Sequence, residues 1–455
     1  MKRSTSTILT KAIAALAAAV LSAATLTACG GSSAPGGGGG TGAGATGSAA
    51  DLDAALQKGG ELTYWTWTPT GQAQADAFMK QHPKVRVKVV NAGTGGDHYT
   101  KLQNAVKAGA GAPDVAQVEY YALQQFAISD ALLDLKQYGL GGLKDLYTPS
   151  TWEAVNVGDG LYGLPQDSGP MIMAYNKEVF DENGIDVPAT WEEYIAAAKK
   201  IHEADPKAYI TNDAGDPGFI NPLIWQAGGR PYQVDGTNVR IDLQDEGTKK
   251  WAGMWNRLLQ PGLLSDIPSW SDDWYKALNN GDIATLITGA WIPGILESSV
   301  EQGKGKWRIA PVPSYDGSPD TSENGGSSQA VLKQSKNPAL AAAFLRWLNS
   351  SDESIGVFME GGGFPSTVKQ LNSAEFLGET PEYFGGQKIN EVMVKASQHV
   401  TSGWRYLPFQ VYANSAFADT AGQSYIKRGD LNAGLQAWQA QLVTYGNQQG
   451  FTVNK

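Results

Sequence analysis

Hydrophobic and polar positions follow two different repeats along the chain after residue 60. Short runs rich in β-branched and aromatic residues occupy 61–67, 85–90 and 114–118. Longer amphipathic stretches with helix-forming composition lie between and after them, at 72–81 and 99–108. Strands that alternate with amphipathic helices are typical of α/β proteins. The pattern therefore predicts an α/β fold for the body of the chain.

Residues with capping preferences mark the ends of predicted helices. Asp97 precedes the second helix and is interpreted as its N-cap, and Gly109 and Gly111 are interpreted as its stop. Thr190 and Glu193 have the spacing of a capping box at the start of a later helix. These signals support the helices that the hydrophobic pattern predicts.

The N-terminus has the layout of an export signal. Three basic residues fall within the first eleven positions, and 12–26 follows as an uncharged run. This run of about 15 residues is shorter than the roughly 20 that a membrane span requires. The tetrapeptide 26–29, Leu-Thr-Ala-Cys, resembles the bacterial lipobox, which implies a lipoprotein signal peptide over 1–28 and a lipid on the thiol of Cys29. The alternative is an ordinary secretory signal followed by a buried cysteine.

A glycine-rich segment follows the signal. Cys29 is the only cysteine, so no intramolecular disulfide can form. Residues 29–50 are predicted to be a flexible tether, because 30–50 contains 10 glycines and neither a charge nor an aromatic residue. About 400 residues remain, which is enough for two domains.

The charge of the chain excludes one class of partner. The formal net charge is -10, and removal of the three basic residues of 1–28 makes it -13. No block of Lys and Arg could neutralise a line of phosphates, and no later apolar run is long enough to span a bilayer. We expect an acidic body, tethered outside the cell membrane, with no nucleic-acid partner.

The inventory of catalytic motifs is thin. The four histidines, at 82, 98, 202 and 399, include no pair at helical metal-ligand spacing, and each is interpreted as a surface residue. The motifs HExxH, GxxxxGK and GxSxG do not occur. We therefore expect no catalytic residue, no metal and no cofactor. Acid and base chemistry by two carboxylates stays open, because the separation of carboxylates cannot be read from the sequence.

Aromatic residues are abundant instead, with 14 tryptophans and 18 tyrosines. Six tryptophans fall within helix-like patterns and are predicted to pack in the core: Trp152, Trp191, Trp251, Trp255, Trp347 and Trp438. Five others lie at strand ends or in loops: Trp65, Trp67, Trp225, Trp291 and Trp404. A sugar ring stacks its C–H face on an indole and offers hydroxyls to carboxylates, amides and guanidinium groups. The second set is therefore predicted to contact a ligand.

Several segments, in the same order, resemble the extracellular sugar-binding lipoproteins of ABC importers, the solute-binding family that includes maltose- and maltodextrin-binding proteins. The stretch 161–180, which begins Leu-Tyr-Gly-Leu-Pro-Gln-Asp, is the most specific of them. The others are 61–67, 111–119, 184–194, 281–291, and 325–331 with 336–348. The resemblance implies a fold of two α/β lobes with a central ligand cleft that closes by a hinge.

The same resemblance implies where the lobes begin and end. The first lobe would comprise 61–168 and 311–362, and the second 169–310 and 363–455. The hinges would lie where the chain crosses between lobes, near 168–170, 310–313 and 363–365.

Site residues follow from the resemblance position by position. The first lobe and first crossover would contribute Trp65, Trp67, Glu119, Tyr120 and Asp167, and the second lobe Trp225, Trp291, Trp404 and Arg405. The indoles would stack on pyranose faces, while the two acids and the arginine would exchange hydrogen bonds with hydroxyls.

The implied function is capture of a carbohydrate, with an oligosaccharide favoured by the number of aromatic candidates, and its delivery to membrane permease subunits. The protein would act as a monomer anchored by lipid to the outer face of the cell membrane, and would catalyse no reaction. A tethered glycoside hydrolase using the same aromatics is the alternative, and a structural or adhesive surface lipoprotein is a third possibility.

Overall fold

The computed structural model describes residues 48–454. The predicted signal peptide, Cys29 and nearly all of the predicted tether lie outside these residues. The first element is α1 (Ala49–Lys58), which begins at the last residues of the predicted tether, with Ser48 as its N-cap. Among the described helices, none combines the length and the hydropathy that a membrane span needs.

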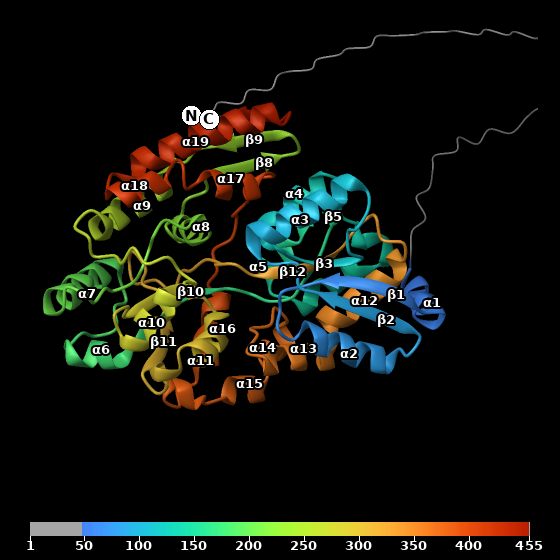
Figure 1. Cartoon of the computed structure of the whole chain (residues 1–455), viewed down its shortest axis with the longest axis horizontal. Coiled ribbons are helices and arrows are strands. Elements are labelled where there is room, and N and C mark those ends of the chain that lie inside the picture. Colours follow the sequence, from blue (N-terminus) through green and yellow to red (C-terminus); the bar gives the residue numbers. More distant parts are fainter. Residues whose placement is uncertain (1–47, 455) are drawn as a thin grey trace, which may run out of the picture. The chain divides into compact units, whose positions relative to one another are not determined.

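Five strands form the largest sheet, in the order β2-β1-β3-β12-β6. They are β1 (Gly60–Trp65), β2 (Val85–Val90), β3 (Val115–Glu119), β6 (Leu164–Pro165) and β12 (Ser327–Val331). β1 runs parallel to β2 and β3, whereas β12 is antiparallel to β3 and β6. β12 is buried throughout, as expected of a strand with neighbours on both sides and helices over the sheet. Figure 1 shows β1, β2 and β3 side by side, which confirms the three strands predicted first.

Helices from two separate stretches of chain pack with this sheet. They are α1, α2 (Gly71–Gln81), α3 (Gly95–Ala108), α4 (Tyr120–Ile128), α5 (Pro149–Ala154), α12 (Pro338–Ser350) and α13 (Asp352–Glu360). Shorter elements between them are η1 (Leu135–Tyr138), η2 (Leu140–Leu146), β4 (Asn156–Val157) and β5 (Gly160–Leu161). Their apolar side chains form one core, the first core, which draws on residues between Leu52 and Leu164 and between Ala330 and Leu348.

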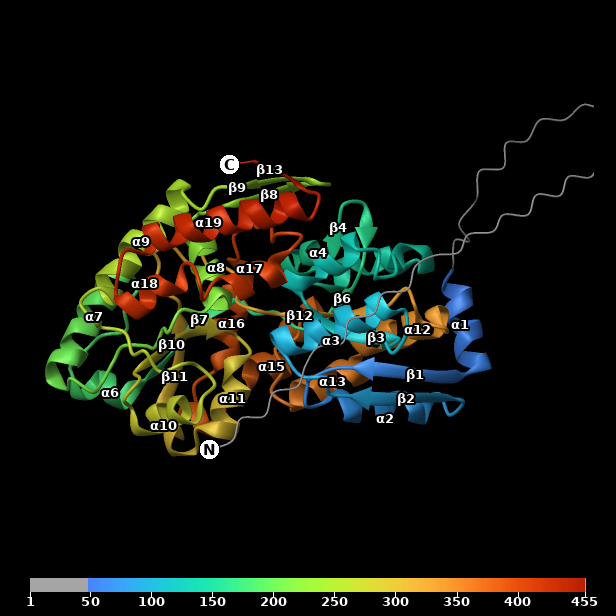
Figure 2. The same ribbon diagram turned by 45° about the horizontal axis from the view of Figure 1, so that its top comes forward.

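Two smaller sheets hold the rest of the chain together. One has the order β10-β7-β11, formed by β7 (Met171–Asn176), β10 (Thr285–Gly289) and β11 (Trp307–Pro311), all antiparallel. The other has the order β13-β9-β8, formed by β8 (Tyr232–Asp235), β9 (Asn238–Ile241) and β13 (Thr452–Asn454). Figure 2 shows the last helix, α19 (Leu431–Gln448), lying along β9.

The helices of this part form two further cores. They are α6 (Lys177–Glu182), α7 (Trp191–Ala204), α8 (Pro217–Gln226), α9 (Glu246–Leu259), α10 (Asp272–Asn280), α11 (Ile292–Ser299), α14 (Val368–Leu371), α15 (Ala374–Gly378), α16 (Ile389–Gln398), α17 (Gln410–Ala416), α18 (Gly422–Lys427) and α19, with η3 (Glu301–Gly303) and η4 (Glu382–Phe384). The second core contains Trp191, Trp255 and Trp438, and the third contains Trp274 and Trp307. Neither shares a buried residue with the first core.

Three segments connect the first core to the other two and lie side by side. They join β6 to β7, β11 to β12, and α13 to α14. The backbone N–H of Ser168 donates to the carbonyl of Phe364 over 3.2 Å, and that of Met171 donates to the carbonyl of Ser322 over 2.8 Å. The backbone of Asn324 in turn donates to Gly169 over 2.7 Å. We call these three connections the crossing segments.

Two predicted hinges lie within the crossing segments, at 168–170 and 363–365. The second connection meets the others at 321–327, further along the chain than the predicted 310–313, because β11 continues to Pro311 and the chain then runs on to β12. The predicted residue boundaries of the two lobes stay a prediction.

The helix caps agree with the sequence in part. Thr190 and Glu193 make the predicted capping box of α7, and Gly109 ends α3 with a φ of 66°. The prediction that Asp97 is the N-cap of α3 is wrong, because the helix begins at Gly95 and leaves Asp97 in its first turn, near the positive end of the helix dipole.

The predicted core tryptophans are buried, except that Trp347 is only partly covered. The interpretation of all four histidines as surface residues is wrong for His98, which is fully buried. Its ring packs edge-to-face against Trp67 at a centroid distance of 5.1 Å. Neutral imidazole is apolar enough to fill a gap between indoles.

Two glycines of α9 provide a matched test of the packing. A Cβ on Gly247 would lie 2.0 Å from the backbone nitrogen of Gly229, whereas a Cβ on Gly253 would meet nothing within 4 Å. We predict that Gly253→Ala raises the free energy of unfolding by about 0.5–1 kcal/mol, because alanine restricts the unfolded chain and favours helix. Gly247→Ala should lower it by more than about 2 kcal/mol, because the helix must move away from Gly229. Urea denaturation of both variants measures the difference, and equal effects would contradict this packing.

Candidate functional site

A cavity of about 400 Å³ lies beside the crossing segments. Its walls come from α4 and α5 of the first core, from the second crossing segment, from α8, and from the loop 400–406. The lining includes Tyr120, Gln124, Ser150, Glu153, Trp225, Glu323, Gly325, Thr401, Trp404, Arg405 and Tyr406. The walls therefore combine residues that are far apart in the sequence and belong to different cores.

Two stacked indoles form the aromatic part of the cavity. The rings of Trp225 and Trp404 are 5.4 Å apart with planes 5° from parallel. The indole N–H of Trp225 donates to the carbonyl of Thr401 over 2.7 Å. The indole N–H of Trp404 is buried and has no hydrogen-bond partner of good geometry among the described residues.

Arg230 connects the two segments that carry this aromatic pair. Its guanidinium donates to the carbonyl of Trp225 over 3.1 Å and to that of Ser402 over 2.7 Å. These bonds tie the end of α8 to the loop that carries Trp404. The burial of the guanidinium lowers the pKa of Arg230, and the nearby Asp245 opposes this shift.

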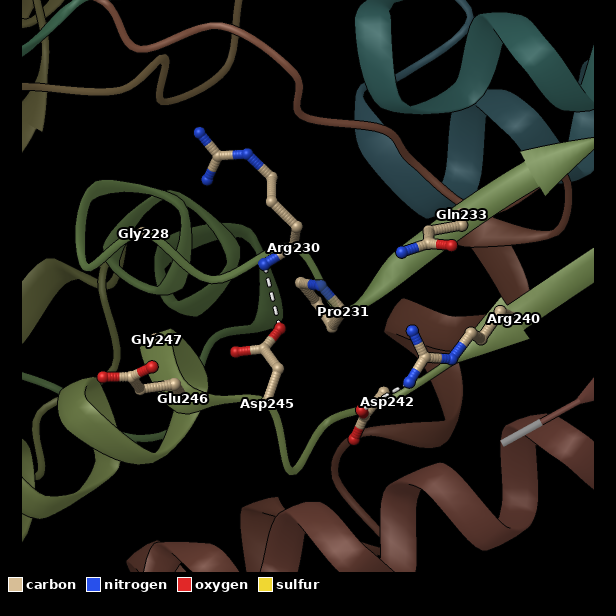
Figure 3. A pocket seen from close by; sticks show the side chains of 9 residues that line it. All are labelled: Gly228, Arg230, Pro231, Gln233, Arg240, Asp242, Asp245, Glu246 and Gly247. Atoms are coloured by element: carbon tan, nitrogen blue, oxygen red, sulfur yellow. Dashed lines mark hydrogen bonds and ion pairs between the residues drawn. The ribbon is translucent and has the colours of Figure 1, made fainter.

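A second hollow of about 270 Å³ lies on the other side of Arg230 and is shown in Figure 3. The backbone N–H of Arg230 donates to Asp245 over 2.9 Å there, while its side chain points away from that carboxylate. Arg240 and Asp242 form an ion pair at 3.1 Å on its rim. Asp242, Asp245 and Arg240 in this hollow thus already have partners on the protein, and we place the candidate site in the larger cavity.

Glu323 contributes a buried carboxylate to the larger cavity. The side chain is 5% exposed and accepts hydrogen bonds from the hydroxyl of Ser150 at 2.9 Å, the hydroxyl of Ser168 at 3.1 Å and the backbone N–H of Gly169 at 2.7 Å. It therefore joins α5 to two crossing segments. Burial raises the pKa of Glu323, and these three donors oppose the shift. The sequence analysis missed this residue, because a single acid before a Gly-Gly pair carries no recognisable signal.

Tyr120, Glu119 and Asp167 form a polar group next to this wall. The hydroxyl of Tyr120 donates to the backbone carbonyl of Asp167 over 2.7 Å. Burial raises the pKa of both Glu119 and Asp167 to about 7, and hydrogen bonds from Tyr99 to Glu119 and from the backbone of Ser327 to Asp167 oppose the shift. Of these three residues, Tyr120 lines the cavity.

Arg405 lines the cavity in an ion pair. Its guanidinium lies 2.9 Å from the carboxylate of Glu153 on α5, and about half of each side chain is exposed. Because Glu153 follows Trp152 of the first core and Arg405 follows Trp404 of the second, the pair links the two cores across the cavity. Its predicted hydrogen bonds to a sugar stay a prediction.

The remaining predicted residues lie outside the cavity lining. Trp65 and Trp67 are partly buried at the end of β1, where both rings meet His98 edge-to-face. Trp291 donates its indole N–H to the carbonyl of Asn324 over 2.7 Å, one residue from the lining residue Gly325. The structure thus brings Tyr120, Trp225, Trp404 and Arg405 together and places the other five around them. The roles of all nine as ligand contacts stay predictions.

Indoles beside carboxylates, hydroxyls and a guanidinium suit a ligand that is apolar on its faces and polar at its rim. No cluster of three or more His, Cys, Asp or Glu within 48–454 is arranged to hold a metal. Separate α/β cores joined by three crossing segments, with such a cavity beside them, define a hinged ligand-binding protein.

The chain belongs to the family of bacterial extracellular solute-binding proteins, which matches residues 64–354. The family expected from the sequence and the two-lobed α/β class of fold are thereby confirmed. Many of the matched relatives and solved structures are carbohydrate-binding proteins of ABC transporters, and they give no support to the alternative of a glycoside hydrolase.

Three similar proteins illustrate the family. An ABC transporter associated binding protein from B. animalis subsp. lactis Bl-04, in complex with beta-1,6-galactobiose, is 42% identical and has a TM-score of 0.81 over 87% of this chain and 99% of its own. The galacto-N-biose-/lacto-N-biose I-binding protein from Bifidobacterium longum, in complex with lacto-N-biose, is 28% identical with a TM-score of 0.76, again over 87% and 99%. A lactose-binding protein from Rhizobium radiobacter is 27% identical over 72% of this chain and 80% of its own length.

Glu119 and Asp167, whose pKa values burial raises to about 7, predict how stability depends on pH. Between pH 5 and 7 the folded protein retains protons on Glu119 and Asp167 that the unfolded chain has released, so their contribution to stability is lost as the pH rises through about 7. We predict that unfolding requires more free energy at pH 5.5 than at pH 7.5. The gain should shrink by about 2 kcal/mol in Glu119→Gln or Asp167→Asn, measured by urea denaturation at both pH values.

The exposed carboxyl Glu301 supplies the control for this measurement. Glu301→Gln should leave the difference between the two pH values unchanged. The assignment of the raised pKa values to Glu119 and Asp167 is contradicted if their variants respond to pH as the wild type does.

Proposed function

We propose that this protein is the extracellular carbohydrate-binding component of an ABC importer and that the cavity beside the crossing segments binds the sugar. The observation that carries the proposal is the stacked pair Trp225 and Trp404 next to buried polar groups, in a chain 42% identical to a galactobiose-bound binding protein. The protein captures its ligand as a monomer and delivers it to the permease subunits.

The substrate class we propose is an oligosaccharide with a terminal β-galactosyl group. Beta-1,6-galactobiose, lacto-N-biose and lactose, the sugars named for three similar proteins, share this group and differ in linkage and in the second ring. The axial hydroxyl of galactose leaves one ring face lined by C–H groups, which suits stacking on an indole. The carboxylate of Glu323 would accept a hydrogen bond from a hydroxyl at the rim of the sugar.

Binding occurs without a chemical step in this proposal. Glu323 is held by three donors on the protein, and Arg405 by Glu153, so these two charged groups have structural partners before a ligand arrives. A preorganised polar site selects strongly for sugars whose hydroxyls match its donors and acceptors.

Calorimetric titration of residues 48–455 with beta-1,6-galactobiose, lacto-N-biose, lactose and maltose tests the proposal. We predict binding of at least one galactoside and none of maltose. Trp404→Ala should weaken that binding about tenfold or more, because the mutation removes an aromatic wall of the cavity on which the sugar stacks. The sugar should be recovered unchanged by chromatography after prolonged incubation, whereas its hydrolysis would favour the glycoside hydrolase.

Trp347→Ala is the matched control. Trp347 is a partly buried tryptophan of α12 that packs on Phe78 at a ring distance of 5.2 Å and does not line the cavity. Its loss should lower the melting temperature but leave the affinity unchanged. Equal loss of affinity in the two variants would mean that the cavity is not the sugar site.

We also propose that the protein is a lipoprotein anchored through Cys29 to the outer face of the cell membrane, after removal of the signal peptide 1–28. The support is the Leu-Thr-Ala-Cys sequence at 26–29 and the membership of an extracellular family.

In a bacterium that expresses the full chain, the wild type should sediment with membranes and incorporate labelled fatty acid. Cys29→Ser should remain in the soluble fraction without label, because serine offers no thiol for the lipid. The purified variant should bind sugar as the wild type does. Membrane association that persists in Cys29→Ser would contradict lipid anchoring at this residue.

A further inference from the structure

Trp270 stands apart from every other tryptophan in the described residues. It is 50% exposed, whereas the others are buried or partly buried. Its backbone has a φ of 70°, a left-handed conformation that only three non-glycine residues within 48–454 adopt. A bulky residue in this region is strained, and such strain persists only where the surroundings impose it.

The surroundings of Trp270 impose its left-handed conformation, because hydrogen bonds of Asn212 hold the loop before α10 in place. The side-chain amide of Asn212 donates to the carbonyl of Ile267 over 3.0 Å and to the hydroxyl of Ser269 over 2.9 Å. Its oxygen accepts from the indole N–H of Trp274 over 2.8 Å. Asn212 is 7% exposed, so these bonds are shielded from water. Trp270 is therefore a solvent-facing ring on a rigid loop.

Trp270 lies against Trp291, which borders the cavity wall. Their ring centroids are 5.8 Å apart, with planes tilted by 37°. Trp291 is fixed by its hydrogen bond to Asn324 and by a close glycine, since a Cβ on Gly289 would lie 2.3 Å from its indole nitrogen. Gly325, the next residue after Asn324, lines the cavity. A chain of contacts thus connects the cavity to Trp270, from Gly325 through Asn324 to Trp291.

We propose that Trp270 is the stacking surface of an outer subsite, which takes a further sugar ring of an oligosaccharide whose terminal galactosyl group occupies the cavity. The proposal rests on the proposed function. Asp266 and Asp272, four residues before and two residues after Trp270, are exposed, and in this proposal their carboxylates accept hydrogen bonds from hydroxyls of that sugar. An indole that is already rigid loses little conformational freedom when it binds a sugar. The braced backbone of Trp270 keeps its ring rigid before binding.

The position of Trp270 outside the cavity lining separates its role from that of Trp404. A disaccharide held in the cavity would not reach the outer subsite, whereas a longer chain would. The subsite therefore predicts an effect of ligand length: loss of Trp270 weakens long ligands and spares short ones.

The experiment is a titration of wild type and Trp270→Ala with β-1,6-linked galactobiose and galactotetraose. The wild type should bind the tetraose more tightly than the biose. Trp270→Ala should bind the biose within twofold of the wild type and the tetraose about tenfold more weakly. Ile426→Ala, which removes an exposed apolar side chain on α18, should change neither affinity.

Trp270→Gly distinguishes function from packing. Glycine accepts a positive φ without strain, so this variant should melt at a higher temperature than Trp270→Ala while losing the same affinity for the tetraose. If the wild type binds neither sugar, the proposed β-galactoside function fails and the subsite with it. If it binds both, and Trp270→Ala weakens both equally or neither, the outer subsite alone is overturned.

Discussion

The carboxylate of Glu323 is the interaction on which the arrangement of the three cores depends. It is nearly buried and accepts from Ser150, Ser168 and Gly169, which belong to α5 and to the first crossing segment. A buried carboxylate is tolerated only when donors replace the water it has lost. The donors here come from residues more than 150 positions away in the chain, so the crossing segments must stay aligned for the group to remain satisfied. Because the same side chain lines the cavity, a ligand that contacts it also acts on the alignment of the crossing segments.

The tryptophans divide into three groups by their surroundings. Trp191, Trp251, Trp255 and Trp438 are fully buried and hold the second core together. Trp225 and Trp404 line the cavity, supported by Arg230 and the loop 400–406. Trp270 packs against Trp291, and Trp291 is hydrogen-bonded to Asn324 of the second crossing segment. Tryptophan side chains therefore fill the second core, line the cavity or face the solvent, depending on their position in the fold.

Much of the fold could be predicted from local patterns. The strands β1, β2 and β3, the capping box of α7 and the buried helix tryptophans depend on residues close in sequence, and all are present. The family could be predicted because its segments occur in order along the chain. The prediction for His98 was wrong because its burial depends on the indoles of Trp65 and Trp67 at the end of β1. The spacing of residues along the sequence does not reveal these contacts.

The candidate site was harder to predict for the same reason. Glu323, Glu153 and Trp270 meet their partners only after distant segments come together, so nothing near them in the sequence identifies them. Arg405 was singled out, but its ion pair with Glu153 joins residues about 250 positions apart.

The position of β12 within the first sheet has a consequence for the order in which the chain acquires its structure. β12 lies between β3 and β6, although more than 160 residues separate it from β6 along the chain. The N-terminal half therefore cannot finish its own sheet and must wait for a strand that emerges much later. Long-range pairing of this kind slows folding. A chain with this topology becomes compact only after most of its length has been synthesised.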